Sequence, residues 1–146
     1  MDASAVAAAT AVGVIGIGNM GLALALRLLD GSYRVTVRDL RPDVEAAAAR
    51  AGARVAADPA DVAHECALLI VVVVDAAQCN DVLFGPRGAV LCLRPGQTVM
   101  LCPTIAPQDV ERLAARLAAR GVDCIDAPMS GGPQRARDGS MSLMVA

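Results

Sequence analysis

The chain has 146 residues and a net charge of −2, and all 13 of its basic side chains are arginine. This length suits one domain, and a 55% share of hydrophobic residues argues against a disordered chain. The acidic balance argues against binding to nucleic acid or to an anionic membrane surface. The absence of lysine excludes a lysine Schiff base or a lysine general base within these residues.

Short runs rich in β-branched residues recur along the chain and predict seven strands. These lie at Val12–Ile17, Tyr33–Arg38, Arg54–Val55, Leu68–Val74, Gln97–Cys102, Asp123–Asp126 and Met141–Val145. The run Leu68–Val74 contains no polar residue, which is typical of a strand buried on both faces of a sheet.

Helical patterns with start and stop signals fall between these runs. Helices are predicted at Asn19–Leu29, from Pro42 to Gly52, from Pro59 behind Asp58 as a cap, and at Pro107–Arg120. The alternation predicts one α/β domain at residues 12–146, after an N-terminal extension at residues 1–11. The expected fold is a Rossmann-type, doubly wound, mainly parallel sheet with helices on both faces.

The segment Ala3–Leu26 carries no charge and is long enough to cross a membrane. Its four glycines and Asn19 argue against that interpretation, and a strand, a turn and a helix explain it better. We therefore expect no membrane segment.

Five cysteines are spread along the chain without a C-x-x-C pair, and His64 is the single histidine. An odd count without close pairs fits neither a zinc site nor a disulfide framework. The sequence predicts reduced, buried thiols in a cytoplasmic protein and no bound metal.

A glycine motif follows the first predicted strand, Gly16-Ile17-Gly18-Asn19-Met20-Gly21. In a strand–turn–helix context the spacing G-x-G-x-x-G is typical of a dinucleotide site. Gly16 would allow the tight turn, Gly18 would admit a diphosphate close to the backbone, and Gly21 would let the helix pack on the strand. The N–H groups of the first helical turn would then bind the diphosphate.

Asp39 ends the second predicted strand, 18 residues after Gly21. A carboxylate there can accept hydrogen bonds from the adenosine ribose and would repel a 2′-phosphate, which favours NAD over NADP. Arg38 and Arg41 flank it and would suit a phosphate, so NADP stays an alternative. A helix cap or a loop carboxylate is the other interpretation of Asp39.

Four segments together resemble the β-hydroxyacid dehydrogenases, a family related to 6-phosphogluconate dehydrogenase: Val14–Gly21, Thr104–Pro107, Asp126–Gly132 and Gly139–Val145. The resemblance covers the chain from Val12 onward. Within the family, the segments 72–78 and 82–85 look most like the L-threonate dehydrogenases, with the 3-hydroxyisobutyrate and tartronate-semialdehyde enzymes as alternatives.

The resemblance implies roles for residues outside the glycine motif. Leu40, Val73, Val74 and Asp75 would line the cofactor crevice, and Thr104 would lie beside the nicotinamide. The turn Ser130-Gly131-Gly132 would bind the carboxylate of a small substrate. A plain helix cap at Ser130–Gly132 and a simple strand-end hydroxyl at Thr104 are the alternatives. Pro103 and Met129 depart from the residues usual in the family.

The family also uses a lysine on a long helix downstream, as the general acid or base. Since this chain has no lysine and no catalytic residue of that kind, we expect it to be the N-terminal cofactor domain of a protein about twice as long. An all-helical C-terminal domain would carry the lysine and the contacts of a homodimer or homotetramer. The chain alone would bind the dinucleotide without turnover.

Two other functions are possible for such a protein. It would be a nucleotide-sensing or interaction protein if the parent has lost catalysis. It would be an imine-reductase-like enzyme if another acid replaces the lysine.

Overall fold

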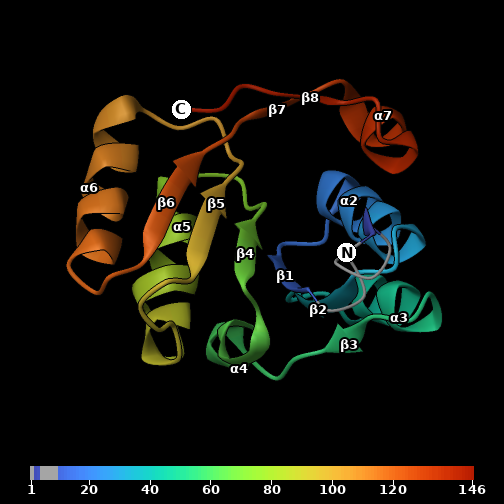
Figure 1. Cartoon of the computed structure of the whole chain (residues 1–146), viewed down its shortest axis with the longest axis horizontal. Coiled ribbons are helices and arrows are strands. Elements are labelled where there is room, and N and C mark those ends of the chain that lie inside the picture. Colours follow the sequence, from blue (N-terminus) through green and yellow to red (C-terminus); the bar gives the residue numbers. More distant parts are fainter. Residues whose placement is uncertain (1, 4–9) are drawn as a thin grey trace.

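The computed structural model describes residues 2, 3 and 10–146. Most of the predicted N-terminal extension, residues 1–11, therefore lies outside the described residues. Six strands form a parallel sheet in the order β3-β2-β1-β4-β5-β6 (Figure 1). The strands are β1 (Ala11–Ile15), β2 (Arg34–Arg38), β3 (Arg54–Val55), β4 (Leu68–Val71), β5 (Thr98–Leu101) and β6 (Asp123–Asp126).

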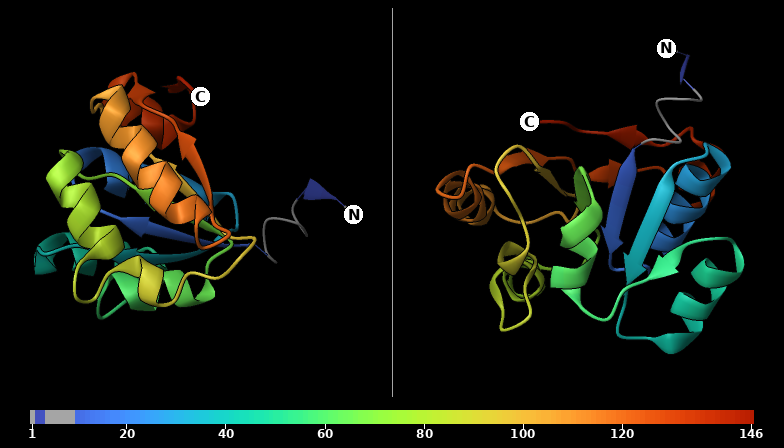
Figure 2. Two further views of the ribbon diagram at one scale, coloured as in Figure 1. Left: turned by 90° about the vertical axis from the view of Figure 1, so that its left-hand side faces the viewer. Right: turned by 60° about the horizontal axis from the view of Figure 1, so that its bottom comes forward.

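The connections between these strands are helical, as the alternation predicted. They are α2 (Asn19–Asp30), α3 (Pro42–Arg50), α4 (Pro59–Glu65), α5 (Ala76–Phe84), the 3-10 turn η1 (Ala89–Leu91) and α6 (Pro107–Ala118). Figure 2 shows helices on both sides of the sheet, which confirms the doubly wound α/β fold.

Alternate residues of each central strand enter two separate cores. Val14 and Ile70 face the core shared with α2 and α3, whereas Leu69 and Val71 face the core shared with α4, α5 and α6. All four side chains are nearly or fully buried. The prediction that the run Leu68–Val74 is buried on both faces is therefore confirmed for Leu69–Val71, whereas Val74 is exposed.

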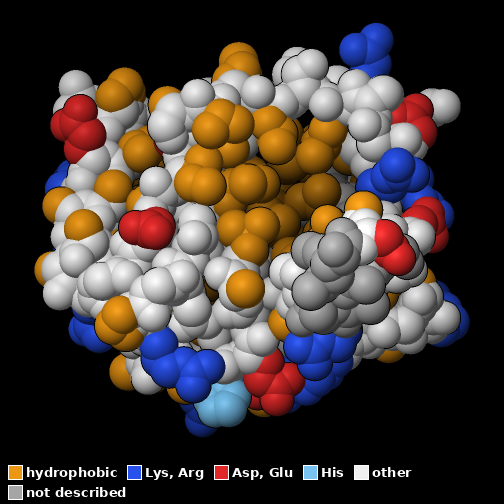
Figure 3. All heavy atoms as spheres, viewed as in Figure 1, with side chains coloured by type: hydrophobic (Ala, Val, Ile, Leu, Met, Phe, Trp, Pro, Cys, Tyr) orange, Lys and Arg blue, Asp and Glu red, His pale blue; other side chains and the backbone are white. Residues whose placement is uncertain are grey.

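The two cores differ in how completely helices cover them. On the α2 side, α2 and α3 pack against β1, β2 and β3, and no helix of the described chain crosses β4, β5 and β6 in Figure 1. Figure 3 shows hydrophobic side chains gathered in a hollow on this face. Val72, Ile125, Met129 and Met141 belong to this core and remain only partly buried.

Three predicted strands end earlier in the structure than in the sequence pattern. The first ends at Ile15, the fourth at Val71 and the fifth at Leu101, because each chain turns away where the parallel register Ile15↔Val71↔Leu101 ends. The apolar residues that follow lie in the loops at the carboxyl edge of the sheet. The predictions were therefore too long at this edge.

The prediction for Met141–Val145 needs a larger correction, because the segment does not join the parallel sheet. Ser142–Leu143 (β8) pairs antiparallel with Met129–Ser130 (β7), in a separate two-stranded sheet. Ala146 continues this pairing with two backbone hydrogen bonds to Asp126. The chain reverses direction through α7 (Gly132–Asp138), which the sequence did not predict. Helix α5 was missed as well.

The uncharged segment near the N-terminus forms β1 and most of α2 where it is described. Over residues 2, 3 and 10–146, none of the helices is both long and apolar enough to cross a bilayer.

Four thiols make the stability of the fold depend on pH. Burial raises the pKa of Cys66, Cys79 and Cys124 from 9.0 to about 11, and that of Cys102 to about 12. Between pH 9 and about pH 11, these thiols lose their protons in the unfolded chain and keep them in the folded chain. The stabilisation is therefore complete below pH 9 and is lost as the pH rises toward 11.

We expect the urea midpoint of unfolding to fall between pH 8.5 and 10.5. Because the chain has no lysine, no side-chain amine titrates in this range and the thiols dominate the effect. Urea unfolding followed by circular dichroism at several pH values measures the midpoint. A midpoint that stays constant to pH 10.5 would contradict the prediction.

Candidate functional site

The turn between β1 and α2 forms the centre of the site. Gly16 has a φ of +87°, and a Cβ there would lie 2.3 Å from the carbonyl oxygen of Val72. The Val72 N–H in turn donates to the carbonyl of Ile15 at 2.8 Å. Only glycine lets the turn approach the end of β4 this closely.

The two other glycines of the motif have different surroundings. A Cβ at Gly21 would lie 1.9 Å from the carbonyl oxygen of Gly16, so α2 packs directly on the turn. A Cβ at Gly18 would meet only the guanidinium of Arg41, at 3.5 Å. Gly18 thus borders open space, and no side chain caps α2 at this residue. The N–H groups of the first turn of α2 have no acceptor within the helix, which suits an anion.

Asp39 connects the end of β2 to this turn. Its Oδ2 accepts a hydrogen bond from the Ile17 N–H at 2.9 Å, and its Oδ1 accepts one from the Arg41 N–H, also at 2.9 Å. The cap of α3 is Arg41 and not Asp39, so the helix-cap interpretation is wrong. The Oδ1 also accepts from the Arg41 Nε at 3.5 Å, so Oδ2 is the oxygen that keeps a further lone pair for a ligand hydroxyl.

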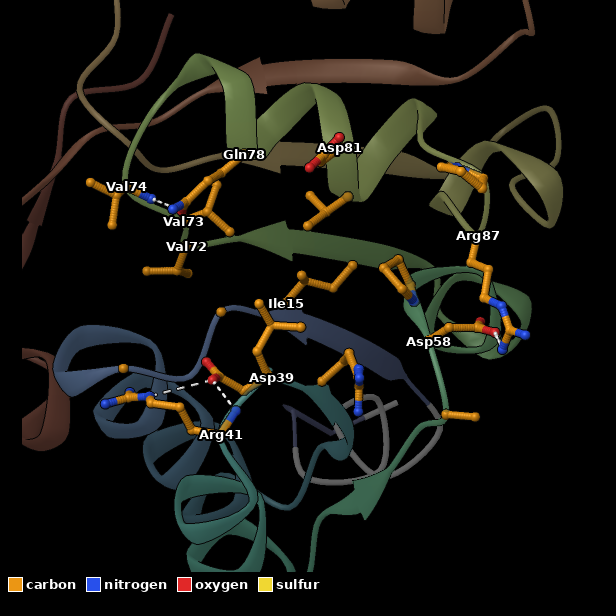
Figure 4. Close-up of a pocket in the computed structure, with 18 of the residues that line it drawn as sticks. Ile15, Asp39, Arg41, Asp58, Val72, Val73, Val74, Gln78, Asp81 and Arg87 are labelled. Atoms are coloured by element: carbon orange, nitrogen blue, oxygen red, sulfur yellow. Dashed lines mark hydrogen bonds and ion pairs between the residues drawn. The ribbon is translucent and has the colours of Figure 1, made fainter.

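A pocket of about 1040 Å³ opens beside these residues, between the ends of β1, β2 and β4 (Figure 4). Seven of the predicted site residues line it: Gly16, Gly18, Asn19, Asp39, Leu40, Val73 and Val74. Leu40 and Val74 are among the most exposed large apolar side chains of the described chain, at 90% and 78%.

Other predicted residues support the pocket without lining it. Ile17 is fully buried in the core, and it reaches the site only through its N–H. Met20 lies in the first turn of α2 beside Gly21. Asp75 caps α5, because its Oδ1 accepts the Gln78 N–H at 2.8 Å.

The predicted substrate residues lie at the same edge of the sheet, after β5 and β6. Thr104 is exposed in the loop before α6, whose cap is Ala106. Ser130 ends β7 and is exposed. Gly131 (φ +124°) and Gly132 (φ +75°) form the turn into α7. The cap of α7 is Gly131, without a side-chain hydrogen bond, so Ser130 does not cap this helix.

No pattern in the sequence indicated the opposite wall of the pocket. This wall comes from the loop before α4, from α5 and from the loop after it, and consists of Ala57, Asp58, Pro59, Gln78, Asp81, Val82, Pro86 and Arg87. The cap at Asp58 was recognised, but nothing in the sequence placed it across from Asp39. No sequence pattern indicated that Arg87 belongs to the site.

A thiol lies close to this edge but is not a nucleophile. Burial raises the pKa of Cys102, which directly follows β5, to about 12, so the group stays neutral. Among the described residues, no three His, Cys, Asp or Glu side chains are placed to hold a metal ion. The chemistry of the pocket is that of hydrogen bonds and backbone N–H groups.

A family model described as the NAD binding domain of 6-phosphogluconate dehydrogenase matches residues 11–146. The chain belongs to this family. The match covers the glycine turn, Asp39 and the segments around Thr104 and Ser130. The resemblance inferred from the sequence motifs is therefore confirmed.

Individual relatives agree with this assignment. The L-threonate dehydrogenase of Cupriavidus necator is 41% identical over 135 residues, which are 92% of this chain and 46% of the relative. The solved structure of 3-hydroxyisobutyrate dehydrogenase from Salmonella typhimurium is 35% identical with a TM-score of 0.88, over 93% of this chain and 47% of that one. The chain spans about half the length of the curated relatives it matches.

Cofactor-bound and functionally different structures also share the fold. Psf3 in complex with NADP+ and 2-OPP is 35% identical with a TM-score of 0.87, over 92% of this chain and 48% of that one. An imine reductase from Pseudomonas sp. is 28% identical with a TM-score of 0.75, over 86% of this chain and 43% of that one. The fold is thus shared by proteins of different activity, and the site has to indicate the function of this one.

The structure predicts that Asp39 stabilises the fold without any ligand. Replacing it with Ala removes the acceptors of the Ile17 and Arg41 N–H groups, and we expect the free energy of unfolding to fall by about 1–3 kcal/mol. Asp39→Asn should cost less, because the amide oxygen still accepts one of these hydrogen bonds. Urea unfolding at pH 7 measures both, with the exposed Asp123→Ala as the matched control. A cost equal to that of the control would refute this role.

Proposed function

We propose that this chain is the cofactor domain of an NAD-dependent oxidoreductase that acts on a small β-hydroxyacid. The observation that carries the proposal is the pocket itself. It joins an uncapped helix N-terminus behind Gly18 to the Asp39 carboxylate, at the carboxyl edge of a parallel sheet. This is where doubly wound folds bind dinucleotides.

Each part of the pocket suits one part of the cofactor. The backbone at Gly16–Met20 would bind the diphosphate through N–H groups, and Gly21 keeps α2 in place behind it. Asp39 would accept hydrogen bonds from the adenosine ribose, and Leu40 would cover the adenosine from the exposed side. Val73, Val74 and the turn capped by Asp75 would line the path toward the nicotinamide.

The charges around Asp39 favour NAD over NADP. Both guanidinium groups that could bind a 2′-phosphate already face carboxylates: Arg38 contacts Glu45 at 3.1 Å, and Arg41 contacts Asp39 at 3.5 Å. A 2′-phosphate would share these guanidinium groups with the carboxylates and would lie next to the negative charge of Asp39, which disfavours it. The NADP+ complex of Psf3 shows that this fold also accommodates the phosphate.

Thr104, Ser130, Gly131 and Gly132 would bind the substrate. The N–H groups of the Ser130–Gly132 turn would donate hydrogen bonds to a carboxylate, and the Thr104 hydroxyl would lie beside the nicotinamide. NAD, when bound, accepts a hydride from the carbon that carries the hydroxyl group. We propose L-threonate or a related sugar acid as substrate, because the relative from Cupriavidus necator is an L-threonate dehydrogenase. 3-Hydroxyisobutyrate and tartronate semialdehyde are alternatives.

The acid or base for the hydroxyl proton has to come from outside these 146 residues. The Cys102 thiol, two residues before Thr104, stays neutral because burial raises its pKa to about 12, and the chain has no lysine. We propose that a further helical domain supplies it. Two observations support this: the apolar hollow over β4, β5 and β6 and relatives about twice as long. This domain would also carry the dimer or tetramer contacts.

Calorimetry with the 146-residue chain tests cofactor binding. We expect NAD+ to bind at least tenfold more tightly than NADP+. Gly18→Ala should leave the fold stable, because its Cβ meets only Arg41 at 3.5 Å, but it should weaken NAD+ binding at least tenfold by holding the diphosphate off the backbone.

The matched control is Gly31→Ala at the other end of α2, where a Cβ would have ordinary contacts of 3.4 Å and φ is −81°. This variant should bind NAD+ like the parent chain. No binding of either cofactor to the parent chain would overturn the proposal. Equal binding of NADP+ would overturn the preference for NAD.

Turnover tests the second half of the proposal. The 146-residue chain with NAD+ and L-threonate should produce no NADH, measured by absorbance at 340 nm, because the proton acceptor is missing. Rapid NADH formation by this chain alone would contradict the need for a second domain. A substrate screen on the complete parent protein, hydroxyacids against cyclic imines, separates a dehydrogenase from an imine reductase, and no turnover with either indicates a sensing protein.

A further inference from the structure

The far end of the pocket carries a pair of opposite charges whose function the cofactor motif does not explain. Arg87, in the loop after α5, contacts Asp58, in the loop before α4, at 3.6 Å, away from Val74 and Arg41 (Figure 4). We propose that Asp58 and Arg87 together recognise the edge of the adenine base. This inference rests on the proposed function, because it assigns the part of the pocket that lies beyond the ribose.

The loops that carry Asp58 and Arg87 are both attached to the first turn of α4 by hydrogen bonds. The Asp58 Oδ1 accepts the Asp61 N–H at 2.8 Å and thereby caps α4. The Arg87 carbonyl accepts the Ala60 N–H at 3.1 Å, which ties its loop to the first turn of α4. These hydrogen bonds hold the two loops next to each other. The Asp58 Oδ2 and the Arg87 guanidinium face each other across the gap between the loops.

The contact between them leaves bonding capacity for a ligand. At 3.6 Å it is an ion pair without a hydrogen bond, and the Arg87 side chain is 77% exposed. Within the described chain the guanidinium makes no side-chain hydrogen bond. An ion pair this exposed contributes little to stability. A ligand would therefore gain two charged hydrogen-bonding groups at little cost to the fold.

Three other polar side chains of the pocket already have hydrogen-bond partners. Arg38 is bound to Glu45, and Arg41 to Asp39. The Gln78 Oε1 accepts the Val74 N–H at 2.9 Å. Among the ion pairs at the described pocket, Asp58–Arg87 is the one whose two charged groups lie side by side without a hydrogen bond between them.

This pair matches one edge of adenine. The base carries an amino donor at N6 next to an acceptor nitrogen, so the carboxylate of Asp58 can accept from the amino group while Arg87 donates to the ring nitrogen. Hypoxanthine has an oxygen at position 6 and would place it against the Asp58 carboxylate. No aromatic side chain lines the pocket, so stacking on an aromatic ring cannot supply the recognition of the base.

The test compares NAD+ with nicotinamide hypoxanthine dinucleotide by calorimetry on the 146-residue chain. We expect the parent chain to bind NAD+ at least tenfold more tightly. Asp58→Asn and Arg87→Gln should each reduce this preference to threefold or less. Asn caps a helix as well as Asp does, so Asp58→Asn keeps α4 intact. Arg54→Gln is the matched control, because Arg54 pairs with Asp61 on the same helix and lies outside the pocket.

The possible results distinguish a failure of the adenine-recognition proposal from a failure of the proposed function. A parent chain that binds both dinucleotides equally overturns the assignment of Asp58 and Arg87 and leaves the cofactor domain in place. The same follows if both variants keep the full preference for adenine. A parent chain that binds neither dinucleotide overturns the proposed function itself. The comparison on the parent chain is decisive even if a variant does not fold.

Discussion

Three backbone segments meet without intervening side chains where β1 turns into α2, and the rest of the site depends on this contact. The turn at Gly16 lies against the carbonyl of Val72, and α2 lies against the carbonyl of Gly16 through Gly21. The contact fixes the start of α2 at the point where the order of the sheet reverses, between β1 and β4. A Cβ at either glycine would push these elements apart and close the entrance to the helix N-terminus.

Asp39 extends this arrangement to the second strand. Because its carboxylate accepts the N–H of Ile17, the end of β2 is joined to the glycine turn without a nucleotide. The pocket is therefore largely formed in advance. A pre-formed site loses less entropy on binding, which favours affinity for a flexible dinucleotide.

The two ends of the pocket use different chemistry. Around Gly18 the backbone presents N–H groups to a diphosphate, an interaction that any dinucleotide shares. At the far end, Asp58 and Arg87 present side chains whose contact is loose, and which can therefore discriminate between bases. The backbone around Gly18 thus provides affinity for the diphosphate, and Asp58 and Arg87 provide selectivity for the base. A mutation at one end of the pocket should leave the interaction at the other end unchanged.

Much of the fold was readable from the sequence, because strand periodicity and helix signals are local. The six parallel strands, the glycine turn and the place of Asp39 follow from residue types and spacing. Strand ends were predicted less well, since Val72, Val73 and Cys102 are apolar residues that leave the sheet where their neighbouring strands end. The reversal at Met141–Val145 was missed because side chains alternate between the two faces in every strand, so a short segment does not indicate which direction it runs.

The sequence by itself determined the α/β class, the dinucleotide motif and the family, because each depends on the types and spacing of residues near one another in the chain. Only the tertiary structure decided which residues face Asp39 across the pocket. Asp58 and Arg87 are 29 positions apart and are joined by the packing of α4 against the loop after α5. No local pattern encodes that distance, because it results from how two cores bring separate helices to the same edge of the sheet.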